Sequence, residues 1–266
     1  MKFTFCPLFS GSSGNAVFVG ARNTRILIDA GLPGRKIDEA LSSIGIFPET
    51  LNAILVTHEH TDHTKGVGVL SRKYHVPVYA NARTWEAMQR CIGAVDASCC
   101  RMFESGESFF IGDLEVLPYR ISHDAAEPVG YRIHCGGHSV ATATDIGIFT
   151  AKVLSALAET DIVLLESNHD EDMLRANEHY SAQLKARILS RYGHMSNAAC
   201  GEALFQLYQT GVRHAVLGHL SHENNTPELA MQTVCAALRA HGLHPGEDIQ
   251  VDMAWRDHVG GVYVID

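Results

Sequence analysis

The stretch His58-Glu59-His60-Thr61-Asp62-His63 directly follows an apolar run, residues 52–57, that is typical of a buried strand. Positions i and i+2 of an extended backbone point the same way, so His58 and His60 can hold one ion while Asp62 and His63 face a second. Neutral imidazole and carboxylate suit zinc, manganese or iron, and two such ions can activate water for hydrolysis. A solvated, histidine-rich turn is the alternative interpretation, but the alternating spacing after an apolar strand favours a metal site.

The composition indicates a globular protein. The chain has 266 residues, of which 46% are hydrophobic and 19% are charged, and this length is compatible with one large core. We therefore expect a single domain over residues 1–266. No stretch approaches the roughly twenty consecutive apolar residues of a membrane-spanning helix, and the N-terminus lacks the apolar region of a signal peptide. Seven cysteines without a Cys-x-x-Cys pair favour reduced thiols and a cytoplasmic location.

The formal net charge of −9 restricts the partners. Two bound divalent ions would bring this charge to about −5, which is still acidic. The balance argues against broad, sequence-independent binding along duplex DNA or RNA. It remains compatible with an enzyme that captures a chain end in a pocket. The oligomeric state cannot be inferred from the sequence.

Apolar and β-branched runs alternate with helical patterns along the whole chain. We expect strands at residues 3–8, 16–20, 24–29, 52–57, 76–80, 107–111, 114–120, 129–134, 139–144, 161–165, 214–217 and 261–265. We expect helices within residues 31–45, 66–74, 82–92, 181–192, 196–210 and 226–242. No linker, charge block or repeat separates the two halves, which again predicts one domain.

Three further ionisable residues each follow an apolar run: His123, Asp145 and His219. Taken alone, a histidine after a strand is more often a surface residue than a ligand. Together they supply what the hexapeptide lacks, namely a third nitrogen for the first ion, and a bridging carboxylate and a closing imidazole for the second.

In order and rough spacing these residues resemble the motifs of the metallo-β-lactamase superfamily. The motifs are Ile28-Asp29, the 58–63 hexapeptide, His123, Asp145 and His219. Five more segments resemble the YycJ/WalJ-like branch: SGSSGN at 10–15, SHDAAEPVGY at 122–131, ESNHD at 166–170, GHMSN at 193–197 and HLSHENN at 219–225. The resemblance extends over nearly the whole chain.

The resemblance implies an α/β fold, the αββα sandwich of two mixed sheets flanked by helices, with a dinuclear centre of zinc or manganese at the sheet edges. It implies a phosphodiesterase that acts as a 5′→3′ exonuclease on DNA ends carrying a 5′-phosphate. By position, His58, His60 and His123 would hold one metal, Asp62, His63 and His219 the other, and Asp145 would bridge them. Asp29 would hold the metal loop, residues 58–63, by hydrogen bonds. Asp62 and His194 would be the catalytic residues.

His194 lies in a segment that opens a predicted helix, as does a histidine that assists phosphodiester cleavage in tRNase Z-like relatives. A helix N-terminus attracts phosphate, and Ser196 and Asn197 add donors, so both are candidate substrate-binding residues. Glu166 could orient His194 or simply face solvent. Ser196 or Asn197 could equally be an ordinary N-cap, with His194 a turn residue.

A Ser/Gly loop near the N-terminus offers further candidates for substrate binding, because such loops can form anion nests. Its candidates are Ser12, Ser13 and Asn15. The same loop could equally be an ordinary turn that connects two strands of a hairpin.

Two other functions compete with the nuclease. The first is hydrolysis of a thioester, a lactam or a small phosphodiester on the same scaffold, which the acidic charge favours slightly. The GHMSN and ESNHD segments speak against carbonyl chemistry, which would not need them. The second is a non-enzymatic regulator with a structural metal, but such sites are normally closed by four ligands, whereas seven candidates exist here.

Overall fold

The computed structural model describes residues 2–266, which form two compact units. The first unit holds residues up to 120 together with 125–138 and 255–266, and the second holds 121–124 and 139–254. The strands belong to two mixed sheets of seven strands each, flanked by helices. The expected sandwich class is thereby confirmed. The expectation of one domain stays a prediction.

The first sheet lies entirely in the first unit, in the order β14-β1-β2-β3-β4-β5-β6. Its strands are β1 (Phe3–Phe9), β2 (Ala16–Ala21), β3 (Thr24–Ile28), β4 (Ala53–Leu55), β5 (Val78–Ala80), β6 (Cys100–Met102) and β14 (Tyr263–Ile265). The strands from β14 to β3 pair antiparallel, and those from β3 to β6 pair parallel. Parallel pairing brings the carboxyl ends of β3 and β4 to the same edge, where the metal loop begins.

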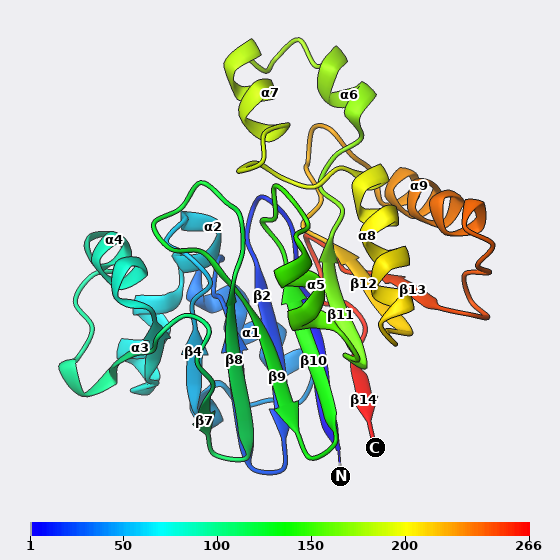
Figure 1. The fold of residues 1–266 in the computed structure, drawn as a ribbon. Coiled ribbons are helices and arrows are strands. Elements are labelled where there is room, and N and C mark those ends of the chain that lie inside the picture. Colours follow the sequence, from blue (N-terminus) through cyan, green and yellow to red (C-terminus); the bar gives the residue numbers. More distant parts are fainter. Residues whose placement is uncertain (1) are drawn as a thin grey trace. The chain divides into compact units, whose positions relative to one another are not determined.

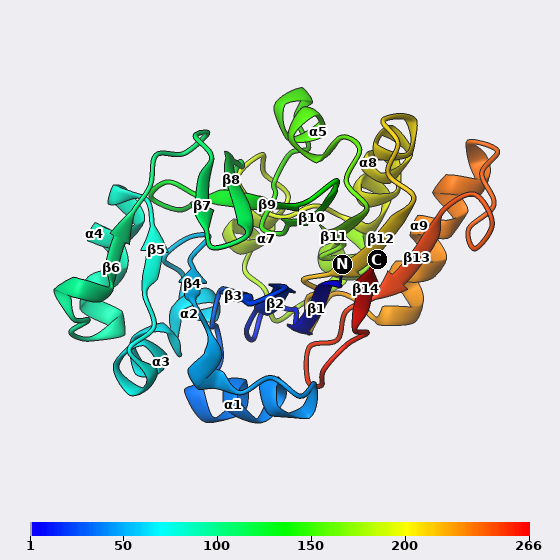
Figure 2. The same ribbon diagram turned by 90° about the horizontal axis from the view of Figure 1, so that it is seen from below.

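Four helices accompany this sheet: α1 (Gly34–Ser43), α2 (Thr61–Thr64), α3 (Val67–Tyr74) and α4 (Ala82–Ile92). Ile37, Ala40 and Leu41 follow helical spacing and are buried, so α1 packs its apolar side on the sheet. Figure 2 shows α1 along one face of the strands β1 to β4. Together with apolar residues of α3 and α4 they close one hydrophobic core with the sheet. Two short 3₁₀ turns, Pro48–Thr50 and Ala97–Cys99, complete the connections.

Three antiparallel strands of the second sheet also belong to the first unit: β7 (Phe109–Ile111), β8 (Leu114–Arg120) and β9 (Val129–Cys135). Buried and less buried residues alternate in the first part of β8 and in the last part of β9, as expected for strands with one covered face. The hydroxyl of buried Tyr131 donates to the carbonyl of Val56 at 2.6 Å, at the start of the metal loop.

The second unit carries four parallel strands: β10 (His138–Ala143), β11 (Ile162–Glu166), β12 (His214–Gly218) and β13 (Gln250–Met253). Its helices are α5 (Ala151–Leu157), α6 (Glu171–Ala176), α7 (Ala182–Ile188), α8 (Asn197–Gln209) and α9 (Pro227–Ala240). In Figure 1, α8 and α9 run beside these strands, and α6 and α7 stand apart from them. The near-continuous burial of β11 and β12 is typical of parallel strands.

Some local expectations were wrong. The helix expected over 181–192 ends at Ile188, because the chain turns at Ser190, whose hydroxyl donates to the Arg187 carbonyl. The helices α5 and α6 and the strands β6 and β13 were not expected. Among residues 2–266, no helix is both long enough and apolar enough to cross a membrane.

Candidate metal centre

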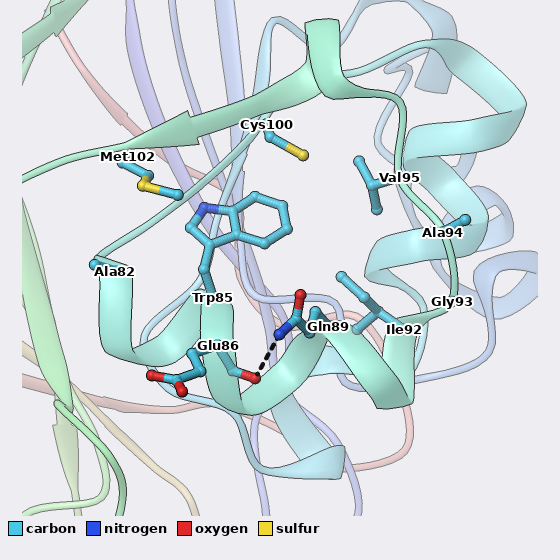
Figure 3. Close-up of a pocket in the computed structure, with 10 residues that line it drawn as sticks. All are labelled: Ala82, Trp85, Glu86, Gln89, Ile92, Gly93, Ala94, Val95, Cys100 and Met102. Atoms are coloured by element: carbon cyan, nitrogen blue, oxygen red, sulfur yellow. Dashed lines mark hydrogen bonds between the residues drawn. The ribbon is translucent and has the colours of Figure 1, made fainter.

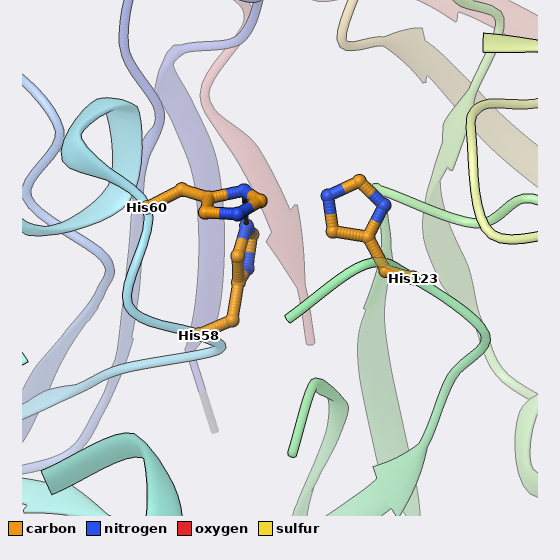
Figure 4. Close-up of side chains that lie close together, drawn as sticks. All are labelled: His58, His60 and His123. Atoms are coloured by element: carbon orange, nitrogen blue, oxygen red, sulfur yellow. Dashed lines mark hydrogen bonds between the residues drawn. The ribbon is translucent and has the colours of Figure 1, made fainter. Parts of the chain in front are cut away.

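The hexapeptide begins where β4 ends and leads into the single turn of α2. His58 and His63 are fully buried, and His60 stands at the N-cap of α2. His58 Nε2 lies 3.1 Å from His60 Nδ1, and the two rings meet edge-on at 79°. Figure 4 shows these two rings on the loop after β4, and His123 on the loop after β8. Two imidazole nitrogens that face each other at this distance are placed to share one cation.

Asp29, directly after β3, holds this loop by hydrogen bonds to Thr57 and His63. Its Oδ1 accepts the backbone N–H of Thr57 at 2.8 Å, and its Oδ2 accepts from the Thr57 hydroxyl at 2.8 Å and from His63 Nδ1 at 2.7 Å. A carboxylate bound to Nδ1 fixes the orientation of the ring, as it commonly does for histidines that bind a metal through Nε2. The backbone of Asp29 has a φ of 59°, a strained conformation for a residue other than glycine.

The Ser/Gly loop packs under the hexapeptide. Asn15 is buried, and its Nδ2 donates to the carbonyl of Gly11 at 3.1 Å and lies 3.1 Å from His63 Nε2. Asn15 is therefore placed to support the metal loop. Ser12 and Ser13 are exposed at the tip of the loop. The substrate-binding role of all three stays a prediction.

Gly31 explains how these segments approach so closely. A Cβ at this position would lie 1.6 Å from the carbonyl oxygen of Asp62, so only glycine fits. Its N–H donates to the carbonyl of Asn15 at 2.8 Å, and the N–H of Asn15 donates to that of Asp62 at 2.8 Å. The backbone thus fixes Asp62 beside His63, with Asp62 Oδ2 3.5 Å from His63 Nε2.

In the second unit, Asp145 and His219 follow the ends of β10 and β12, and both are buried. Both have positive φ values, 59° and 55°, so the strain seen at Asp29 recurs at these strand ends. Asp145 Oδ2 lies 3.2 Å from His219 Nδ1. The side chain of Asn168 anchors this strand end by donating to the His219 carbonyl at 2.8 Å.

Glu166 ends β11 and is completely buried. Its Oε2 accepts the backbone N–H groups of Ile146 and Met195 at 2.8 and 3.0 Å, and its Oε1 lies 2.9 Å from His194 Nδ1. This carboxylate is thus placed to orient His194 rather than to face solvent. The side chain of His194 remains 19% exposed.

His123 lies close to Asp145 and to the segment that carries His194. Its Nδ1–H donates to the carbonyl of Gly193 at 3.1 Å, and its Nε2 lies 3.7 Å from Asp145 Oδ1. Burial lowers the pKa of His123, an effect that the charge of Asp145 opposes. A lowered pKa favours the neutral imidazole, which is the form that binds metals.

Ser196 and Asn197 are occupied in supporting α8. Ser196 is its N-cap: the hydroxyl accepts the N–H of Ala199 at 3.3 Å and donates to Glu171 at 3.2 Å. Asn197 accepts from the hydroxyl of Ser167 at 2.7 Å and donates to Asn225 at 2.9 Å. Their substrate-binding role stays a prediction, and the structure adds a structural role for both.

The donor sets of each unit suit a divalent cation. Asp145, Glu166, His194 and His219 offer ligand atoms that all lie within 4.8 Å of one another, and the hexapeptide offers three imidazoles and the carboxylate of Asp62. Imidazole and carboxylate in this proportion fit zinc or manganese. Thr57, Gly31 and Asn168 support these donors and were not identified from the sequence, because a support is recognised only by its contact.

Two surface pockets of the first unit lie elsewhere. One, of about 470 Å³, is formed by α4, the loop after it and β6 around Trp85, as Figure 3 shows. The other, of about 620 Å³, lies beside β14. None of the predicted site residues lines either pocket.

Residues 24–220 match the family described as the β-lactamase superfamily domain. The chain is 41% identical over 251 residues to the exodeoxyribonuclease WalJ of Streptococcus pneumoniae, covering 94% of this chain and 93% of the relative. It is 38% identical to the exodeoxyribonuclease YycJ of Bacillus anthracis, covering 94% of this chain and 95% of that one.

Solved structures show the same fold. The metallo-β-lactamase fold protein YhfI from Bacillus subtilis superposes with a TM-score of 0.73 at 15% identity, covering 99% of this chain and 100% of that one. Zinc-bound PqqB from Methylobacterium extorquens superposes with a TM-score of 0.72 at 17% identity, covering 99% of each chain. By the family match and by this identity along nearly its whole length, the chain belongs to the metallo-β-lactamase superfamily and to its WalJ/YycJ branch.

Proposed function

We propose that this protein is a metal-dependent phosphodiesterase that degrades DNA from its 5′ ends. The observation that carries the proposal is 41% identity, over 94% of the chain, to a relative that is an exodeoxyribonuclease. The histidine and aspartate donors of both units support it, because a hydrolase of this family needs such donors.

The proposed ligands follow the motif order. His58, His60 and His123 hold one ion, Asp62, His63 and His219 hold the other, and Asp145 is shared. This assignment draws ligands from both units and therefore goes together with the prediction of one domain over residues 1–266. Zinc and manganese are the proposed metals. When bound, the two ions supply Lewis acidity to the phosphoryl group and to the attacking water.

The proton for the leaving oxygen is supplied by His194. Glu166 accepts a hydrogen bond from Nδ1 and so fixes the orientation of the ring, and Nε2 also carries a proton when the ring is in its imidazolium form. In that state Nε2–H can donate a proton to the oxygen that leaves phosphorus. Asp29 acts on the other half of the site by keeping His63 in the orientation that binds metal.

Four substrates offered side by side to manganese- or zinc-loaded protein test the proposal. They are linear DNA with a 5′-phosphate, the same DNA with a 5′-hydroxyl, closed circular DNA and a thioester. We expect the 5′-phosphorylated DNA to be degraded fastest, with mononucleotides released from the 5′ end, and the circle and the thioester to persist. Rapid nicking of the circle, or hydrolysis of the thioester in preference to DNA, would overturn the proposal.

A further inference from the structure

The helix α7 and the turn after it, residues 182–192, form a basic segment on an acidic protein. This segment carries Lys185, Arg187 and Arg191 and no acidic residue, whereas the whole chain has a net charge of −9. None of the residues of α7 is buried. Exposed Leu189 and Tyr192 add apolar surface. Positive charge next to an exposed aromatic ring is complementary to a nucleic-acid strand.

Two of the three cations are already engaged. Lys185 Nζ donates to the carbonyl of Arg175 at 2.6 Å, and Arg187 forms an ion pair with Asp124. Arg191 has no acidic partner within residues 2–266, and its guanidinium lies 5.4 Å from the ring centroid of Tyr192. The Tyr192 ring is half exposed, at 52%. Arg191 and Tyr192 are therefore the pair that is available to a ligand.

The backbone of this pair is fixed. The hydroxyl of Ser122 donates to the Arg191 carbonyl at 2.7 Å. A Cβ on Gly147 would lie 2.4 Å from the same peptide group, so the chain there packs directly against Arg191. An exposed ring on a fixed backbone loses little conformational entropy when a ligand binds.

Arg191 and Tyr192 also directly precede the segment that carries His194. The next residue, Gly193, is buried, and its carbonyl accepts from His123 Nδ1 at 3.1 Å. His194 follows immediately in the chain. A ligand on Tyr192 therefore contacts the chain two residues before His194, which we assign to phosphodiester cleavage.

We propose that Tyr192 and Arg191 form a binding subsite for an unpaired nucleotide of the DNA strand. The base stacks on the Tyr192 ring, and the guanidinium of Arg191 binds a phosphate of the same strand. A base inside a duplex has no free face for this contact, so the subsite selects single-stranded or frayed ends. The inference rests on the proposed function and names the form of DNA that the site takes.

Equilibrium binding to metal-free protein tests the subsite without turnover. The probe is a fluorescent single-stranded oligodeoxynucleotide with a 5′-phosphate, titrated by anisotropy at fixed salt. Stacking energies of bases on aromatic side chains predict that Tyr192→Ala raises Kd by about 5- to 150-fold, and that Tyr192→Trp restores binding. Arg191→Ala raises Kd less and reduces the salt dependence of binding. A blunt duplex of the same sequence binds more weakly than the single strand.

Tyr208 and Arg213 provide a matched control in the same unit. The Arg213 guanidinium lies 4.0 Å from the ring centroid of Tyr208, so the pair has the same chemistry. It stands at the end of α8 and before β12, whereas His219 follows the other end of β12. Tyr208→Ala is expected to leave Kd for the oligonucleotide unchanged.

An unchanged Kd in both Tyr192→Ala and Arg191→Ala would overturn the subsite, as would an equal rise in Tyr208→Ala. The proposed function fails separately. If Tyr192→Ala loses binding while the metal-loaded wild type leaves DNA intact, the subsite stands and the nuclease assignment is wrong. If the wild type degrades DNA and the variants bind it normally, the reverse holds.

Discussion

The metal loop of the first unit and the cluster of the second unit, formed by Asp145, Glu166, His194 and His219, both contain a histidine that is hydrogen-bonded to a carboxylate. In each, a buried carboxylate at a strand end binds Nδ1 of a histidine: Asp29 with His63 at 2.7 Å and Glu166 with His194 at 2.9 Å. His63 is fully buried, whereas the side chain of His194 is 19% exposed. In the proposed assignment, the enclosed ring of His63 is a metal ligand and the more exposed ring of His194 is a proton donor.

The largest effect is expected from removing one proposed ligand in each unit. His60→Ala in the loop and Asp145→Asn in the cluster should each lower the rate of DNA hydrolysis at least about 10³-fold, because the Lewis acidity at phosphorus is lost. The rate of nucleotide release measures this loss. His222→Ala is the control, since His222 is largely exposed and pairs only with its neighbour Glu223 among the described contacts. If only one of the two substitutions reduces the rate, the two halves do not serve one reaction.

His194→Ala should remove the proposed proton donor of the second unit without affecting metal binding. Loss of a general acid lowers kcat by about 10²–10⁴, while the metal content of the variant stays at the wild-type value. The loss should be much smaller with bis(p-nitrophenyl) phosphate, because p-nitrophenolate leaves without protonation. Steady-state kinetics on both substrates, with elemental analysis, decides between the roles. Metal depletion in the variant would make His194 a ligand, and equal losses on both substrates would leave it no role as an acid.

The two supporting carboxylates should differ in what their removal affects. Asp29→Asn weakens the hydrogen bond to His63 and should lower metal affinity about 10- to 100-fold. Glu166→Gln should change metal affinity little and lower kcat, because in the proposed assignment it orients His194, which acts as an acid and not as a ligand. Competition with a chromophoric chelator measures both affinities. A loss of affinity that is as large in Glu166→Gln as in Asp29→Asn would show that both carboxylates support ligands.

The smallest effect concerns the pH dependence of stability. Burial lowers the pKa of His169 in the second unit and of His134 in the first below the ordinary value of 6.5. The unfolded chain then binds more protons than the folded one, so the free energy of unfolding falls as the pH falls from about 7 toward each lowered pKa. Nearly fully buried His169 contributes at most about 1.4 kcal/mol per pH unit, and half-buried His134 contributes less.

Urea unfolding of metal-free protein at several pH values measures this dependence. His169→Gln should flatten the decline below about pH 6.5 more than His134→Gln does. A decline that is unchanged in His169→Gln would show that its imidazole titrates normally in the folded protein.

The metal loop could be predicted from the sequence because its four donors lie within six consecutive residues and follow an apolar strand. The cluster could be predicted only in part. Asp145 and His219 are marked by the strands before them, but the contacts of Glu166 with Ile146, Met195 and His194 join segments about twenty to thirty residues apart. No local pattern encodes such contacts.

The same limit explains the missed elements and supports. The helices α5 and α6 have only seven and six residues, too few for a clear apolar period. Their N-caps, Thr150 and Asp170, were the available signals. Asn15 was expected to bind substrate because it lies in a Ser/Gly loop, but its hydrogen bonds to Gly11 and its approach to His63 depend on how the loop packs.

The metal content of the purified protein tests the central claim most directly. After loading with manganese or zinc and removal of excess ion, elemental analysis of the wild type should give about two equivalents per chain. His60→Ala and Asp62→Ala should each give about one equivalent or less. One equivalent in the wild type, unchanged in Asp145→Asn, would contradict a centre built from both the loop and the cluster.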